Sequence, residues 1–273
     1  MGRKRDLVSK TASKMARPVK KIRARKSQNY QVSPKLTILM FHRICDDTPA
    51  NAAERDMMMT TKTFRRYCEF FRERFLICSL HEAKGLLKKP LKKPLMVFTF
   101  DDGYENYHAL AFPIMQELKI KSNQNIIVKC ADEVRPGYMN WETIRELEKT
   151  GLVEFGCHTY DKHDLIGDKP VLATTDVEDI KKDLAAASKS FLKELGRKPD
   201  ILAWPYGYVP KNLTKSELNE LGFEFMMNTT SGINFKPVDF GNLKRFAALE
   251  YETPEKLYSI ITGYDDLGFL LGK

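Results

Sequence analysis

The stretch that decides the fold is LMVFTFDDG, residues 95–103. Its first part is a nearly continuous apolar run, which predicts a buried strand, and two carboxylates and a glycine follow at once. Comparable apolar runs alternate with amphipathic stretches along the chain, at 36–41, 75–78, 125–128, 152–156, 201–204, 223–227 and 246–249. This alternation indicates an α/β fold with a parallel sheet covered by helices. Seven or eight such units in about 230 residues favour an incomplete, distorted seven-stranded (β/α) barrel over a doubly wound sheet.

The predicted helices carry recognisable start and stop signals. Ser79 with Glu82, and Thr214 with Glu217, have the spacing of capping boxes. A long amphipathic stretch, 177–195, ends at a glycine, as helices commonly do. The order of strands and helices is therefore defined over most of the chain.

Length and composition indicate one soluble domain with an appendage. The chain has 273 residues, of which 42% are hydrophobic and 30% charged. That length is near the upper limit for a single core. The five cysteines are an odd number without C-x-x-C spacing, which disfavours a disulfide framework or a cysteine zinc site. We expect a tail over 1–35 and one domain over 36–273.

The positive charge of the chain belongs to its first residues. Residues 1–35 hold 12 of the 45 Lys and Arg but only one acid, whereas the remainder has 33 bases and 35 acids. A nucleic-acid partner for the domain is therefore disfavoured. The tail could be a basic amphipathic helix on an anionic membrane surface, an organelle transit peptide or a solvated extension. Because the tail lacks a secretory signal, we expect a cytoplasmic or peripheral membrane location, with the cell envelope as the alternative.

Chemically capable side chains directly follow four of the predicted strands. They are His42, the pair Asp101 and Asp102, His158 with His163 shortly after, and Pro205 with Tyr206. The carboxyl ends of parallel strands share one face of a barrel, and barrel enzymes build their active sites there. This convergence predicts a functional site.

The residue types suit a metal-dependent hydrolase. Two imidazoles and one carboxylate make a three-ligand set with open positions, appropriate for zinc, iron, cobalt or nickel. The spacing of His158 and His163 does not place both on one helical face, so we expect a loop that curls back over 157–170. One aspartate of the pair can bind the ion while the other acts as a base, because a metal-bound water has a pKa of roughly 7. His42 could protonate a leaving amine.

Each of these residues also has a plainer interpretation. An aspartate after a strand can simply cap a helix, here over 105–119, and single or paired histidines are usually structural or solvated. Trp204 and Tyr206 could be ordinary aromatic residues at a rim. Their coincidence on one predicted face is what favours a site.

The motifs resemble those of the polysaccharide deacetylases, carbohydrate esterase family 4, with the NodB-homology fold. TFDDG at 99–103 matches a family motif whose first aspartate is the general base and whose second binds the metal, which implies these roles for Asp101 and Asp102. HTYDKH at 158–163 resembles the motif that supplies two histidine ligands, with one extra residue. That longer spacing is similar to the branch that acts on poly-β-1,6-N-acetylglucosamine.

Two further segments extend the resemblance. LMFHR at 39–43 is similar to the first strand of that branch, which implies His42 as the catalytic acid. AWPYG at 203–207 matches a substrate-groove motif, in which the tyrosine N–H helps to bind the oxyanion. The resemblance implies that three residues of this motif bind the substrate, namely Trp204, Pro205 and Tyr206.

Two features depart from the family pattern. Many members begin the substrate motif with an arginine that pairs with the base, whereas this chain has Ala203 there. Another cation must then hold Asp101, and our hypothesis is Arg245, just before the last predicted strand. The second departure is the lack of a secretory signal, which is unusual for an enzyme of extracellular polymer.

The sequence thus predicts a metal-dependent de-N-acetylase for N-acetylglucosamine-type residues of a polysaccharide or glycoconjugate. One divalent ion, with zinc favoured over cobalt, nickel or iron, is held by Asp102, His158 and His163. Asp101 deprotonates the water, and the oxyanion interacts with the ion and the Tyr206 N–H.

Two alternatives belong to other classes of protein. A catalytically weak carbohydrate-binding or scaffold protein would bind sugar without metal-stimulated release of acetate. A protein whose function lies in its basic tail would bind anionic lipid or nucleic acid with a steep salt dependence, lost on deletion of 1–35. An oxygenase with two histidines and one carboxylate shares the ligand set, but the aspartate pair and the predicted barrel favour hydrolysis.

Overall fold

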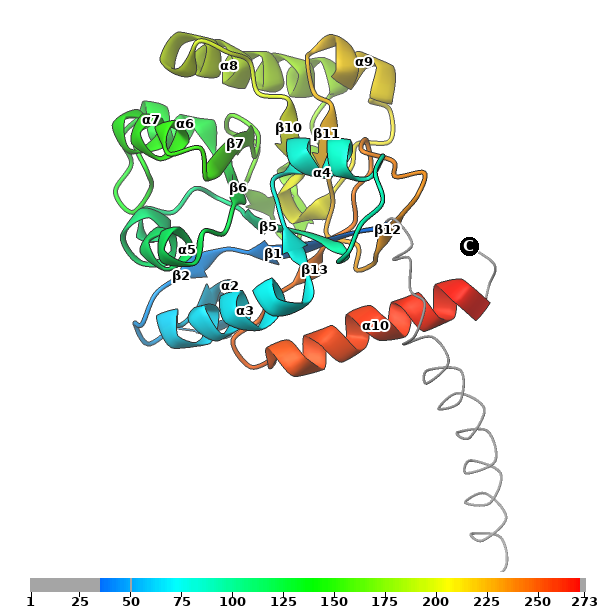
Figure 1. The fold of residues 1–273 in the computed structure, drawn as a ribbon. Coiled ribbons are helices and arrows are strands. Elements are labelled where there is room, and N and C mark those ends of the chain that lie inside the picture. Colours follow the sequence, from blue (N-terminus) through cyan, green and yellow to red (C-terminus); the bar gives the residue numbers. More distant parts are fainter. Residues whose placement is uncertain (1–34, 50, 271–273) are drawn as a thin grey trace, which may run out of the picture.

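A computed structural model describes residues 35–49 and 51–270 of the chain, and a curled nine-stranded sheet forms its centre (Figure 1). The strand order is β11-β10-β7-β6-β5-β1-β12, with β4 paired to β5 and β13 paired to β1. These strands are β1 (Lys35–Phe41), β4 (Leu76–Ile77), β5 (Leu95–Phe100), β6 (Ser122–Ile126), β7 (Val153–Cys157), β10 (Ile201–Ala203), β11 (Phe225–Met227), β12 (Asn234–Phe235) and β13 (Phe246–Ala247). All pairs within this sheet are parallel except that of β1 with β12. The predicted incomplete (β/α) barrel is confirmed.

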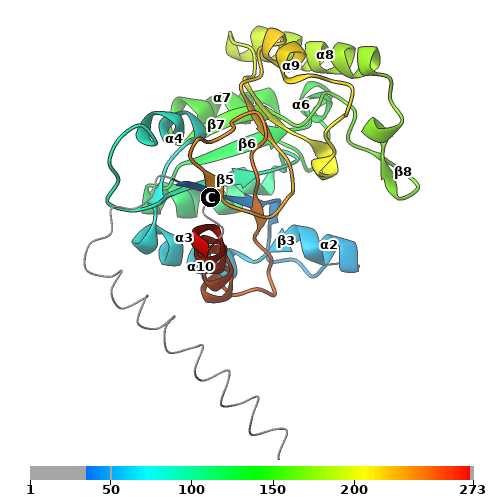
Figure 2. The same cartoon turned by 90° about the vertical axis from the view of Figure 1, so that its right-hand side faces the viewer.

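Helices cover the curled sheet on its outer sides. They are α2 (Ala52–Met57), α3 (Thr61–Arg74), α4 (Leu80–Leu86), α5 (Phe112–Leu118), α6 (Val128–Asp132), α7 (Trp141–Lys149), α8 (Val177–Leu195), α9 (Lys215–Glu220) and α10 (Pro254–Leu270). Helices α3 and α10 lie side by side on one side of the molecule, and α8 and α9 lie on the opposite side (Figures 1 and 2). In the two described ranges, no helix is long and apolar enough to cross a membrane. The tail predicted over 1–35 lies outside the described part, except for Lys35, which begins β1.

The local start and stop signals operate as predicted. Both capping boxes are present, at Ser79 for α4 and at Thr214 for α9. Helix α8 has the predicted bounds and ends at Gly196, whose φ of 70° lies in the left-handed region that glycine favours. These signals could be read correctly because they depend on neighbouring residues alone.

The predicted strand 125–128 is wrong, because the strand in this position is β6, SNQNI at 122–126, and α6 begins at Val128. All side chains of β6 are buried although four of the five are polar. Several of them find partners inside the fold: the Ser122 hydroxyl contacts the Tyr107 hydroxyl at 2.7 Å, and Asn123 donates to a backbone carbonyl. Hydrogen bonds thus satisfy part of the polar groups of this buried strand, while Ile126 packs in the hydrophobic core.

The segment after β12 joins the two edges of the curled sheet. Leu243 forms a parallel bridge with Met227 at the end of β11, and Phe246 of β13 pairs with Leu39 of β1. Arg245 lies between these two attachments and is completely buried. Because the segment is attached to the sheet on both sides of Arg245, this side chain lies in the interior.

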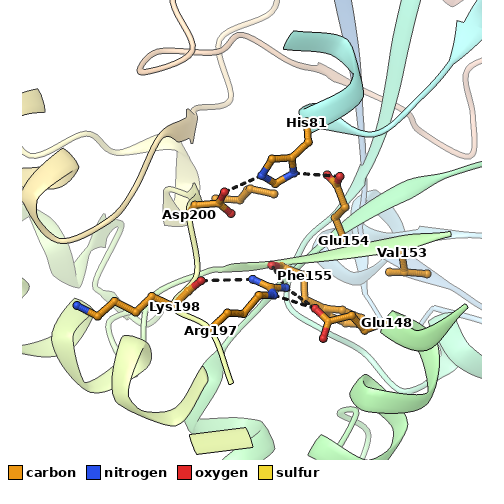
Figure 3. Close-up of a pocket in the computed structure, with 9 residues that line it drawn as sticks. His81, Glu148, Val153, Glu154, Phe155, Arg197, Lys198 and Asp200 are labelled. Carbon is orange, nitrogen blue, oxygen red and sulfur yellow. Dashed lines mark hydrogen bonds and ion pairs between the residues drawn. The ribbon is translucent and has the colours of Figure 1, made fainter. Parts of the chain in front are cut away.

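A charged cluster lies near the amino ends of β7 and β10 (Figure 3). The His81 imidazole bridges two carboxylates, with Nε2 2.6 Å from Asp200 Oδ2 and Nδ1 3.0 Å from Glu154 Oε1. These groups line a cavity of about 410 Å³ together with Arg197 and Glu148, which form a second ion pair. The cluster links the starts of α4, β7 and β10.

The His81 cluster predicts a pH dependence of stability. Hydrogen bonds that His81 donates to Asp200 and then to Glu154 raise its pKa to about 10, from about 6.5 in an unfolded chain. The contribution of His81 to folding is therefore complete below about pH 6.5 and lost as the pH rises through about 10. We expect His81→Ala to destabilise the protein at pH 6 and to have little effect at pH 10.5. Urea unfolding of both proteins at the two pH values measures this, and a difference independent of pH would contradict it.

Candidate active site

Three of the predicted site residues come together at the carboxyl ends of the strands. Asp102 follows β5, His158 follows β7, and His163 lies in the loop beyond. One potential ligand atom from each of the three lies within 4.8 Å of the others. His163 Nε2 is 3.0 Å and His158 Nε2 3.5 Å from the same Asp102 oxygen. Residues that are far apart in sequence thus form one cluster.

Backbone geometry turns Asp102 toward the two imidazoles. Asp102 and Gly103 have φ values of 74° and 81°, so the chain turns sharply as it leaves β5. Glycine is required at 103, because a Cβ there would lie 2.9 Å from Ile126 Cγ2. Asp102 is 2% exposed, and both of its carboxylate oxygens are buried with no hydrogen-bond partner among the described residues. A buried carboxylate in this condition is costly unless a cation compensates it. Asp102 does not cap a helix.

The tautomer of His158 is set by the substrate-motif segment. His158 Nδ1 lies 2.7 Å from the carbonyl oxygen of Ala203, which can only accept, so this nitrogen carries the proton. The Nε2 atom keeps its lone pair and faces Asp102. Burial, followed by the charge of His163, lowers the pKa of His158 to about 4, against the attraction of the carboxylates. His158 is therefore a neutral imidazole at neutral pH, the form in which histidine binds metal ions.

Asp101 has a cationic partner of its own. Arg245 forms a bidentate ion pair with it, from Nη1 to Oδ1 and from Nη2 to Oδ2, both at 2.8 Å. The Asn125 amide also donates to Oδ1, at 2.7 Å. Burial alone would raise the pKa of Asp101, but the Arg245 guanidinium outweighs it and holds this pKa well below its ordinary value. Asp101 is ionised at neutral pH and fixed in one orientation.

The sequence predicts that Arg245 pairs with Asp101, because position 203 is an alanine here and not the arginine of many family members. Arg245 lies beside Asp101, as that hypothesis requires. Its Nε donates to the Asn228 carbonyl at 2.9 Å, and Nη1 also reaches the Thr99 hydroxyl at 3.3 Å. Sequence reasoning missed Asn125, because the polar strand that carries it gives no apolar signal. The order of charged residues along the chain does not indicate that Asn125 contacts Asp101 either.

His42 directly follows β1, at the same end of the sheet. Its side chain is partly exposed, and its charge influences both Asp101 and Asp102. His42 thus lies on the side of the sheet where the strands leading to the cluster end.

The prediction for the substrate motif needs a correction. Trp204 is 1% exposed and Pro205 is also buried, so neither can offer a face to a sugar ring. Tyr206 is 48% exposed, and its ring centroid lies 5.3 Å from that of His163. Its backbone φ is 56°, and a Cβ on Gly207 would clash with Thr229. The motif thus forms a tight turn that presents one aromatic ring, with its tryptophan packed in the core.

The family model for polysaccharide deacetylases matches residues 88–226, which is half of the chain. The chain therefore belongs to the polysaccharide deacetylase family. The matched range contains Asp101, Asp102, both ligand histidines and the substrate motif, but neither His42 nor Arg245.

Relatives and solved structures agree with this assignment. The poly-beta-1,6-N-acetyl-D-glucosamine N-deacetylase of Escherichia coli (strain K12) is 24% identical over 233 residues, which cover 71% of this chain and 34% of that protein. The protein of the same name from Staphylococcus aureus (strain MRSA252) is 33% identical over 142 residues, 46% of this chain and 48% of that protein. The structure of IcaB from Ammonifex degensii superimposes with a TM-score of 0.72 at 22% identity, covering 85% of this chain and 98% of that one. The chain thus matches between about a third and half of the length of the first two relatives.

Proposed function

We propose that this protein is a metal-dependent de-N-acetylase that hydrolyses the acetamide of N-acetylglucosamine-type residues. One observation carries the proposal: a buried carboxylate without a hydrogen-bond partner, Asp102, faces two imidazoles, and a second, ionised carboxylate lies beside it. Arg245 compensates the charge of Asp101, whereas Asp102 faces two imidazoles, at 3.0 and 3.5 Å, and pairs with no Lys or Arg of the described residues, so it has no permanent cation as its compensation. A divalent cation supplies it.

The donor set fits such a cation. Asp102, His158 and His163 offer one oxygen and two nitrogens, a combination used by catalytic zinc, iron, cobalt and nickel sites. Zinc is the proposed ion. When bound, it acts as a Lewis acid and lowers the pKa of a water to about 7. The carbonyl of Ala203 orients the His158 ring for this role.

The remaining residues hold and move protons. Asp101, ionised and fixed by Arg245, accepts a proton from the attacking water. The Tyr206 N–H is the proposed donor to the developing oxyanion, and the tight turn at 205–207 fixes its direction. His42, at the same end of the sheet, protonates the departing amine of the sugar.

The proposed substrate is an N-acetylated amino-sugar polymer or glycoconjugate. The two relatives from E. coli and S. aureus are named for poly-β-1,6-N-acetylglucosamine, which supports this substrate class. The exposed Tyr206 ring beside His163 can pack against the apolar face of a pyranose. A membrane role for the basic tail and the expected compartment stay predictions, because they concern residues outside the described ranges.

Metal removal tests the proposal directly. We expect the chelated protein to release no acetate from β-1,6-linked N-acetylglucosamine oligomers and to regain the activity on addition of zinc. The expected rate on β-1,4-linked oligomers is lower. The matched control is His108→Ala, an exposed histidine outside the cluster, which should respond to chelator and zinc as the native protein does. Sugar binding without metal-stimulated acetate release would instead support a carbohydrate-binding protein.

A further inference from the structure

The loop between the two histidine ligands is held from an adjacent helix. His158 and His163 are separated by four residues, and Thr159 has a φ of 66°, so the chain turns back sharply. The carboxylate of Asp183, on α8, accepts two hydrogen bonds from this turn. Tyr160 N donates to Oδ2 at 2.8 Å, and Asp161 N donates to Oδ1 at 2.9 Å.

Asp183 lies at a position of α8 where the amphipathic pattern of the helix predicts an apolar residue. It lies on the buried face of α8 beside Ile180, Leu184 and Ala187, and it is 8% exposed. Burial raises its pKa, and no Lys or Arg of the described residues lies within ion-pair distance of it. A carboxylate on a core face is unfavourable unless hydrogen bonds compensate it. Here two backbone amides of the ligand loop provide them.

Other contacts attach the loop through its carbonyls and side chains, including an ion pair between Lys129 Nζ and Asp161 Oδ2 at 2.7 Å. The carbonyls of Thr159 and Tyr160 accept from Val128 N and Lys129 N at 3.2 and 3.0 Å, which attaches the loop to α6. The Thr159 hydroxyl accepts from Lys162 N at 3.2 Å. Among the described groups, Asp183 is the one that binds the amides of residues 160 and 161, midway between the ligands. Its loss would leave both amides without a partner and loosen the turn, although the contacts of Tyr160 O and the Asp161 side chain with Lys129 would remain.

We propose that Asp183 is a positioning residue that fixes the separation of His158 and His163 and thereby sets the affinity of the site for a divalent cation. The inference rests on the proposed function, in which these histidines bind the ion. Asp183 acts through the backbone of residues 160 and 161 and does not touch the ion or the substrate.

The test is a zinc titration of the full, metal-stripped chain against a competing chelator. Asp183→Asn keeps the size of the side chain but replaces one acceptor oxygen by a donor, and we expect zinc affinity to fall roughly 10–100-fold, as for other residues that orient metal ligands. The matched control is Asp179→Asn, on the exposed face of the same helix and paired with Lys182, which should bind zinc as the native protein does.

Hydrogen exchange of the metal-free proteins supplies an independent readout. The amides of residues 160 and 161 should exchange faster in Asp183→Asn and at the native rate in Asp179→Asn. Zinc affinity within twofold of native in Asp183→Asn overturns the inference. If that variant is unfolded without metal, Asp183→Glu is titrated: a folded protein with weakened zinc binding supports the inference, and an unfolded one overturns it. A native protein that binds no zinc defeats the proposed function, whereas the exchange rates still report on the Asp183 contacts.

Discussion

Asp101→Asn is expected to lower the turnover number for acetate release by ~10²–10⁴-fold, the range for loss of a general base. The substitution keeps the shape of the side chain and one acceptor oxygen for Arg245, but it removes the group that accepts the proton from water. Zinc content should stay at the native level, because the ligand candidates are Asp102, His158 and His163. Acetate assays and metal analysis of the same preparation measure both quantities.

The control is Asp168→Asn, an exposed carboxylate in the turn between β8 (Leu165–Ile166) and β9 (Lys169–Pro170). It removes the same charge without touching the cluster, so turnover and zinc content should both be native. An Asp101→Asn enzyme that works at the native rate would remove Asp101 as the base.

Arg245→Met is expected to reduce turnover by ~10²-fold, since a misplaced catalytic group costs about that much. The substitution leaves the Asp101 carboxylate buried with Asn125 as its remaining side-chain donor. Loss of one partner of a buried ion pair lowers the free energy of unfolding by about 3–5 kcal/mol. Without the guanidinium, burial also raises the pKa of Asp101, so the carboxylate becomes protonated more readily. Urea unfolding, turnover and zinc content are the measurements.

A double variant separates the two effects of Arg245. Asp101→Asn with Arg245→Met removes both charges of the buried pair, so much of the stability lost in Arg245→Met alone should return while the protein stays inactive. An equal loss of zinc and turnover in the single variant would count against Arg245 as the partner of the base and would indicate that it supports the metal site.

The barrel and the location of the cluster could be predicted because their signals are local. Apolar runs such as 36–41 and 95–100 became β1 and β5 almost unchanged, and the polar residues that follow them lie at one end of the sheet. The polar strand β6 was displaced in the prediction, because a strand of mostly polar residues has no apolar run. The prediction therefore placed the strand on the apolar residues that follow, some of which belong to α6.

The direction of side chains and contacts between distant segments could not be predicted in the same way. Trp204 has the residue type of a sugar-binding platform, yet it packs inside, since residue type does not specify which way a side chain points. Asp183 interrupts the apolar positions 180, 184 and 187 of an otherwise regular amphipathic helix. This interruption singles out Asp183 in the sequence, but it does not indicate which groups the carboxylate binds.

The attachment of segment 243–247 to both edges of the sheet has a consequence for the order of assembly during synthesis. The strands that carry Asp101 and both ligand histidines leave the ribosome well before Arg245 does. Until then, a nascent chain holds the base carboxylate without its guanidinium, next to a sheet whose edges are not yet joined. Formation of the pair between Asp101 and Arg245 therefore coincides with docking of segment 243–247, which follows the synthesis of the strands that it joins.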